Sequence, residues 1–132
     1  MAAIVPYLCY SDAPAAIDFL CNAFGFDERS RYPMDDGRIG HAELVYEGCA
    51  VYLASVWPEM GLSSPQDLPA RHCQIYVEVE DVDAHCERAR AAGCTISAEP
   101  EDSDHGDRMY RAIDPEGNRW MFSQPIADAA GA

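Results

Sequence analysis

A histidine and a glutamate two residues apart are the chain's clearest candidates for chemistry. His41 and Glu43 both fall in the segment 39–46, which we predict to be a strand. Side chains at alternate positions of a strand point to the same face of a sheet. A histidine oriented by a carboxylate can act as a general base toward a carbon acid. The alternative is a strand histidine that is simply hydrogen-bonded to its neighbour.

Arginines and cysteines offer two further kinds of chemistry. Arg108 and Arg119 could hold a carboxylate or a phosphate, which the planar guanidinium group binds well. The six cysteines form no Cys-x-x-Cys pair and no zinc-binding spacing with histidine. We therefore expect scattered, reduced and mostly buried thiols, and no zinc ribbon or thioredoxin motif.

Composition limits the partners of the protein. The net charge of -14 repels phosphate backbones, so we expect no nucleic acid, and it attracts cationic ligands. No apolar run approaches the roughly 18 residues of a membrane helix, and the first residues lack the features of a signal peptide. These observations predict a cytoplasmic protein without a membrane partner.

The elements that position these residues occur twice. When the sequence is aligned with itself at one constant offset, Tyr7 pairs with Tyr76 and Gly48 pairs with Gly117. A shared offset at turns and element starts indicates a duplicated structural unit. We predict one domain, residues 1–132, with the following parts: a first module 4–56, a Pro-rich linker 57–71, a second module 72–125 and a loose tail 126–132.

Each module is predicted to contain a strand, a helix and three more strands. Asp12 and Asp81 are placed to cap the two helices, and Gly25 and Gly93 to end them. The fold class is therefore α+β, with two tandem β-α-β-β-β modules that form a curled, cup-like mixed sheet. The strands are expected at residues 5–10, 28–34, 39–46 and 50–55, and at residues 74–79, 95–98, 108–113 and 118–123.

One face of each sheet must pack on its helix, and the other, here called the helix-free face, is expected to line the cup. A two-residue turn at 47–48 places Glu43 opposite Tyr52 on the helix-free face of the first module. The same construction places Tyr110 and Ala112 on the helix-free face of the second. The predicted ligand-binding residues are Tyr7, Tyr52, Trp57, Gln74, Tyr76, Glu78, Arg108, Tyr110, Arg119 and Met121, with His41 and Glu43 as the catalytic candidates.

These features resemble the vicinal oxygen chelate superfamily, which includes glyoxalases, bleomycin-resistance proteins and extradiol dioxygenases. The resemblance rests on Gly40-His41-Ala42-Glu43-Leu44, Gly106-Asp107-Arg108 and the run from Asp114 to Trp120. The first two of these segments look most like the PhnB-type branch. The resemblance implies paired β-α-β-β-β modules, a cup for a small molecule and a homodimer.

Metal-using members of that superfamily carry one ligand on the first and one on the last strand of each module. The corresponding positions here are Val5, Tyr52, Gln74 and Met121. A divalent transition metal needs three or four nitrogen or oxygen donors, several of them charged, and this set does not supply them. We therefore expect no cofactor at these positions.

Three functions remain open from the sequence. The first is a metal-independent binding protein whose tyrosine-rich cup suits an aromatic or cationic ligand. The second is an enzyme: a metal-independent lyase or isomerase that uses His41 and Glu43, or a metal-dependent glyoxalase- or dioxygenase-like enzyme with displaced ligands. The third is an interaction module in which the helix-free face is a subunit interface. Trp57 either closes over the ligand or simply packs the linker.

Overall fold

The computed structural model describes residues 2–126. Within it the chain divides into two compact units, Met1–Ala70 and Arg71–Ala132, which are described one at a time. No helix in the described part of the chain is long and apolar enough to cross a membrane. The predicted tail lies outside the described residues apart from Ile126, whose amide donates to the carbonyl of Gly106.

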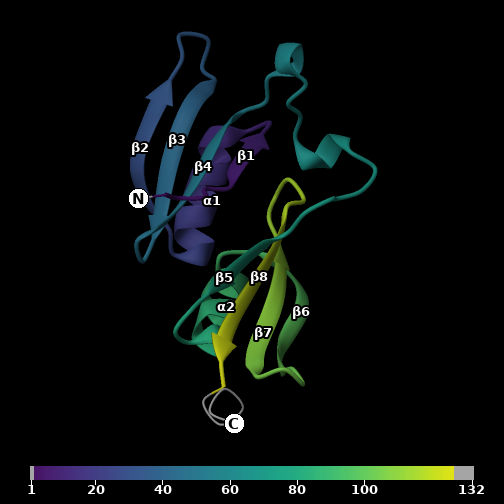
Figure 1. Ribbon diagram of the computed structural model, residues 1–132. Coiled ribbons are helices and arrows are strands. Elements are labelled where there is room, and N and C mark those ends of the chain that lie inside the picture. Colours follow the sequence, from purple (N-terminus) through teal and green to yellow (C-terminus); the bar gives the residue numbers. More distant parts are fainter. Residues whose placement is uncertain (1, 127–132) are drawn as a thin grey trace. The chain divides into compact units, whose positions relative to one another are not determined.

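The first unit is a four-stranded mixed sheet with one helix against it (Figure 1). The strand order is β1-β4-β3-β2, in which β1 and β4 are parallel and the other neighbours are antiparallel. The elements are β1 (Tyr7–Tyr10), α1 (Ala13–Phe24), β2 (Asp27–Pro33), β3 (Ile39–Tyr46) and β4 (Cys49–Ser55). Strand β1 is shorter than predicted: it begins at Tyr7, so Val5 and Pro6 lie before it.

Helix α1 begins and ends as its sequence predicts. The side chain of Asp12 accepts a hydrogen bond from the amide of Ala15, and Gly25 closes the helix at a φ of 85°. Ile17, Leu20 and Phe24 are fully buried, as a helix packed across a sheet requires. Leu44 and Leu53 are also fully buried, which confirms the face of the first sheet that packs on the helix.

The second unit repeats this arrangement, with strand order β5-β8-β7-β6 (Figure 1). Asp81 caps its helix, and Gly93 adopts the left-handed backbone just after it, at a φ of 87°. The elements are β5 (Ile75–Glu78), α2 (Val82–Ala91), β6 (Thr95–Asp102), β7 (Asp107–Ile113) and β8 (Arg119–Pro125). Strand β6 is longer than predicted, since it continues into the acidic segment before the β6–β7 turn.

The two sheets differ in the register of their last hairpins. In the first unit Glu43 pairs with Tyr52, as predicted. The repeat makes Ala112 the counterpart of Glu43 and Met121 the counterpart of Tyr52, yet the residue paired with Met121 is Arg111. The turn of the second hairpin is therefore one residue longer than that of the first. A slip of one residue exchanges the two faces of a strand.

This difference makes the predicted face of Tyr110 and Ala112 wrong. Both are buried, with 0% and 1% exposure, on the side of the sheet that carries α2. The hydroxyl of Tyr110 lies 2.6 Å from Nδ1 of His85 on α2. The helix-free face of β7 instead presents Met109, Arg111 and Ile113.

The same register also makes the predicted face of Arg108 wrong. It points to the helix side, where its guanidinium forms ion pairs with Asp83 of α2 and Asp102 of β6, at 3.1 and 3.0 Å. The guanidinium of Arg108 is therefore already paired with two carboxylates. Of the two arginines predicted to recognise an anion, only Arg119 lies on the helix-free face.

The predicted linker contains two short 3-10 turns, Pro58–Met60 and Pro65–Asp67. Trp57 pairs with Leu62 through backbone hydrogen bonds, and the guanidinium carbon of Arg38 lies 3.9 Å from the centre of its ring. Trp57 is thus packed within the first unit by a cation–π contact. Its closing over a ligand stays a prediction.

Candidate functional site

The helix-free face of the first sheet gathers side chains from all four strands. Tyr7 on β1 pairs with Tyr52 on β4, and Tyr52 pairs in turn with Glu43 on β3. On the next row His41 pairs with Tyr32 on β2. The predicted grouping of Tyr7, His41, Glu43 and Tyr52 on one face is therefore confirmed, and Tyr32 joins it.

A continuous hydrogen-bonded chain crosses this face. The hydroxyl of Tyr7 lies 2.6 Å from Nδ1 of His41, and Nε2 of His41 lies 2.9 Å from Oε2 of Glu43. Arg29 donates from Nε and Nη2 to Oε1 of Glu43, at 2.9 and 2.7 Å. This geometry suits the tautomer of His41 that donates from Nε2 to Glu43 and accepts from Tyr7 at Nδ1.

The electrostatics of the chain are consistent with that assignment. The hydrogen bond from His41, followed by that from Arg29, holds the pKa of Glu43 below its usual value. Partial burial, with the nearby Cys9 and Glu43, raises the pKa of Tyr7. At neutral pH Glu43 is therefore a carboxylate that accepts hydrogen bonds, and Tyr7 is a neutral phenol that can donate one.

Arg29 reaches Glu43 because of an irregularity in β2. The register between β2 and β3 shifts between Glu28 and Ser30, so Arg29 is the extra residue of a β-bulge. A bulge redirects the side chain at its position, and here the guanidinium faces Glu43. No sequence signal points to Arg29, because a bulge interrupts the alternation of side chains that would reveal which face it occupies.

Four rings form what we call the tyrosine cluster: Tyr7, Tyr32, His41 and Tyr52. Their ring centres are 5.0 Å apart for His41 and Tyr52, 5.5 Å for Tyr7 and His41, 5.8 Å for Tyr7 and Tyr52, and 6.0 Å for Tyr32 and His41. These separations are those of interacting aromatic pairs. Tyr7 and Tyr32 nevertheless keep 52% and 60% of their surface exposed within the structure.

The helix-free face of the second sheet is organised around a carboxylate. Asp107 accepts hydrogen bonds from the hydroxyls of Tyr76 and Ser123, at 3.1 and 2.8 Å, and from that of Ser103. These bonds, led by the one from Ser103, lower the pKa of Asp107. The hydroxyl of Tyr76 is thus held in place, although half of its side chain remains exposed.

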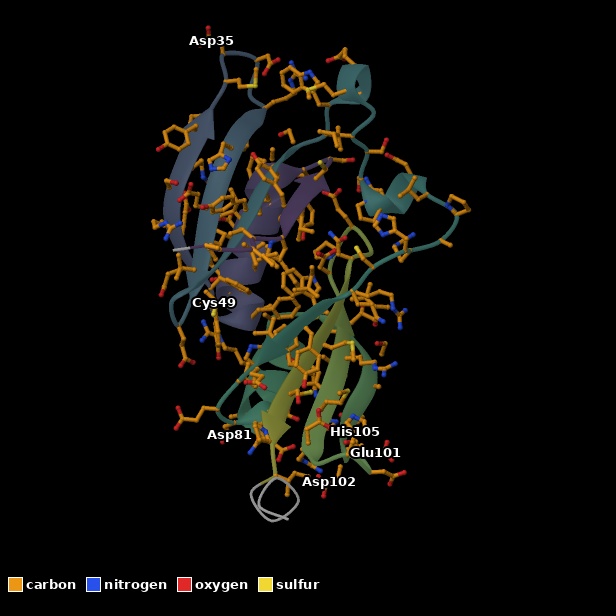
Figure 2. The ribbon with its side chains drawn as sticks, viewed as in Figure 1. Asp35, Cys49, Asp81, Glu101, Asp102 and His105 are labelled. Atoms are coloured by element: carbon orange, nitrogen blue, oxygen red, sulfur yellow. The ribbon has the colours of Figure 1, made fainter. Side chains whose placement is uncertain are left out.

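Acidic side chains dominate the end of this sheet. Figure 2 shows Glu101, Asp102 and His105 close together where β6 turns into β7. A shallow hollow there is lined by Glu99, Glu101, Asp102, Asp104 and His105, among others. Across residues 2–126, however, no three histidine, cysteine, aspartate or glutamate side chains are arranged to hold a metal ion.

The positions that carry metal ligands in the resembling family do not suit a metal here. In the first unit they are Val5, which has no donor atom, and Tyr52, which packs in the tyrosine cluster. In the second unit they are Gln74, just before β5, and Met121, beside Tyr76 on β8. A neutral amide, a phenol and a thioether do not make the charged nitrogen and oxygen set that a divalent transition metal requires.

Comparison with known protein families and sequences places these features in context. The family model of the Glyoxalase/Bleomycin resistance protein/Dioxygenase superfamily matches residues 2–122. Mb0911c of Mycobacterium bovis and Rv0887c of Mycobacterium tuberculosis, both described as uncharacterized, are each 39% identical to the chain over 129 residues. These alignments cover 96% of this chain and 85% and 76% of those proteins, respectively.

Solved structures that share sequence and fold with the chain include TioX and TnmS3. TioX from Micromonospora sp. ML1 is 31% identical with a TM-score of 0.77, over 96% of this chain and 100% of that one. TnmS3 from Streptomyces sp. CB03234, described as an antibiotic binding protein, is 26% identical with a TM-score of 0.71, over 95% and 97% of the two chains. The two sheets and helices described above therefore match a fold already seen in crystals.

Proposed function

The chain belongs to the glyoxalase/bleomycin resistance protein/dioxygenase superfamily, and we propose that within it the protein is a metal-independent binding protein for a small aromatic or cationic molecule. The observation that carries this proposal is the tyrosine cluster. Two of its rings are about half exposed, yet the cluster is ordered by contacts among its own members and by the Tyr7–His41–Glu43–Arg29 chain.

An ordered, exposed aromatic surface is well suited to bind a planar ligand. Stacking on a tyrosine adds about 0.5–1.5 kcal/mol beyond the area buried. A side chain already held by hydrogen bonds loses little conformational freedom when the ligand arrives. Tyr7 is held in this way by His41. TnmS3, a relative of similar length, is described as an antibiotic binding protein, which agrees with a binding role.

The net negative charge of the chain, rather than the carboxylate of Glu43, favours a cationic ligand. That carboxylate is already bound by Arg29 and His41, so it is not available as a counter-ion. The net charge of -14 instead raises the local concentration of cations, and tyrosine faces attract them by cation–π interaction. An aromatic cation would use both effects.

A series of ligands with one ring system tests this proposal. We expect 1-naphthylmethylammonium to raise the melting temperature more than the uncharged 1-naphthalenemethanol does, and we expect any binding of 1-naphthoate to be unaffected by Tyr32→Leu. Tyr32→Leu should weaken binding of the cation about three- to tenfold, because it removes one stacking surface. Tyr32→Phe, which keeps the ring, is the matched control. No stabilisation by any of the three compounds, or equal binding by the leucine and phenylalanine variants, would count against the proposal.

A second candidate function is a metal-independent lyase or isomerase. The observation in its favour is the Tyr7–His41–Glu43 chain, which has the base and the orienting carboxylate of an acid–base pair. Since Tyr7 and Glu43 contact both ring nitrogens, His41 would take the proton of a carbon acid by way of the Tyr7 hydroxyl. Deuterium uptake from D2O into hydroxyketones, followed by NMR, should then vanish in His41→Ala. Uptake no faster than in buffer would dismiss this candidate.

A homodimer is the assembly that we propose with this function, as the resemblance implies. Sedimentation equilibrium gives the mass directly. If the helix-free face were a subunit interface instead of a ligand site, Tyr32→Leu would change the oligomeric state and leave the binding of 1-naphthylmethylammonium as it is. The two readouts therefore separate an interface from a ligand site.

A further inference from the structure

A small basic hollow lies beside the start of β5 in the second unit. Its volume is about 170 Å³, and none of the described residues that line it carries a carboxylate. This is a local exception, because the chain has 23 acidic residues against nine basic ones. The lining residues are Arg71, His72, Cys73, Gln74 and Arg119.

The guanidinium of Arg71 packs directly against Gly117, an arrangement here called the seat of Arg71. Its Nε donates to the carbonyl of Gly117, at 2.8 Å. A Cβ at Gly117 would lie 3.2 Å from the Cζ of Arg71 and closer still to Nη2, so the missing side chain gives the guanidinium its place. This seat fixes the orientation of the planar group against the β7–β8 turn.

Arg119 has no carboxylate partner among residues 2–126, in contrast to most of the arginines. It lies at the start of β8 on the helix-free face, opposite Ile113. Arginines that pair with a carboxylate include Arg29, Arg31, Arg38, Arg90 and Arg108. Arg119 therefore offers a guanidinium that no carboxylate of residues 2–126 neutralises, and it lines the same hollow as the guanidinium of Arg71.

We propose that this hollow binds the anionic group of a small molecule, a carboxylate or a phosphate-type oxyanion. Arg71 and Arg119 supply planar donors that match an oxyanion, and the amide of Gln74 can donate a further hydrogen bond. Gln74 is one of the positions at which the resembling family places a metal ligand. Two guanidinium groups beside it repel a divalent cation and favour an anion at the same place.

Titration with two simple anions tests this inference. Acetate and inorganic phosphate are added at constant ionic strength, with chloride as the exchanged ion, and the arginine Nε–H signals are followed by NMR. We expect saturable shifts of the Arg71 and Arg119 signals. Acetate represents a planar carboxylate and phosphate a tetrahedral oxyanion, so the tighter of the two assigns the ligand class.

Two variants separate a defined site from general electrostatics. Arg119→Gln should weaken anion binding about tenfold or more, as the loss of a charge-assisted hydrogen bond predicts. Arg111→Gln removes the same charge from the same sheet face outside the hollow, so it should change affinity less than about twofold. If Arg119→Gln does not fold, Arg71→Gln provides the same comparison.

The inference is overturned if neither anion gives saturable shifts, or if Arg111→Gln weakens binding as much as Arg119→Gln. It does not depend on the tyrosine cluster, which belongs to the first unit. Anion binding that persists when the naphthalene compounds fail would refute only the proposed function, and the reverse result would refute only this inference.

Discussion

The seat of Arg71 on Gly117 gives a sharp prediction, because the repeat provides its own control. Gly117 and Gly48 occupy equivalent turns of the two modules, and both have left-handed backbones, with φ of 95° and 85°. A Cβ at Gly48 would meet nothing within 4 Å, whereas one at Gly117 would collide with Arg71. The change Gly→Ala thus tests conformation alone at Gly48, and conformation plus displacement of Arg71 at Gly117.

The expected magnitudes follow from these two contributions. A left-handed backbone costs an alanine about 1–2 kcal/mol, so Gly48→Ala should lower the free energy of unfolding by about 1 kcal/mol. Gly117→Ala should cost a further ~0.5–1.5 kcal/mol, since Arg71 loses its hydrogen bond to the carbonyl of Gly117. In an Arg71→Ala background that additional cost should disappear, leaving a coupling energy of about 1 kcal/mol.

Urea unfolding measures all four members of this cycle. Tryptophan fluorescence and circular dichroism are followed together, since coincident transitions are needed for a two-state treatment. The midpoints should shift while the dependence on denaturant stays constant. If Gly117→Ala costs the same with and without Arg71, the guanidinium is not seated on the glycine. The oriented donor of the proposed anion site would then be lost as well.

Three further predictions concern single side chains. Glu43→Gln should remove part of the protein's loss of stability at acid pH. The folded-state pKa of Glu43 is lowered, so its contribution to stability is present above the usual glutamate pKa and is lost as the pH falls through the lowered value. Melting temperatures of both proteins between pH 7 and pH 3 measure this difference. Tyr110→Phe should cost about 1–2 kcal/mol in urea unfolding, because it removes the hydrogen bond between the Tyr110 hydroxyl and the buried His85 of α2. A cost near zero would place Tyr110 on the helix-free face after all. Iodoacetamide at pH 7.5 should label the exposed Cys49 and Cys73 long before Cys94, as followed by mass spectrometry. Burial, followed by the nearby Asp114, raises the pKa of Cys94 to about 11. Rapid labelling of Cys94 would contradict this prediction.

The first unit could be predicted closely because its signals are local. Asp12 and Gly25 bound the helix through hydrogen bonds and backbone angles within a few residues of each other. The two-residue turn at Glu47 and Gly48 fixes the register of its hairpin, and with it the face of every side chain on β3 and β4. His41 and Glu43 therefore lie together on the helix-free face as predicted.

The second unit shows where local signals are insufficient. The constant offset of the repeat predicts the correct sheet face for Met121 but the wrong face for the residues of β7. The reason is that the turn between β7 and β8 is one residue longer than the turn between β3 and β4. Each face assignment on a strand depends on such a count. Tyr110 consequently lies in the core against α2, and Arg111 takes the place predicted for its neighbours.

The sequence by itself determined the duplication, the α+β class, the helix ends and the absence of a suitable metal-ligand set at Val5, Tyr52, Gln74 and Met121. Only the tertiary structure decided that Arg29 reaches Glu43 through a bulge and that Arg71 rests on Gly117. Residue types, repeats and caps are properties of neighbouring positions. The partner of a side chain on a sheet depends on how strands distant in sequence align, and hydrogen bonding across the whole sheet sets that alignment.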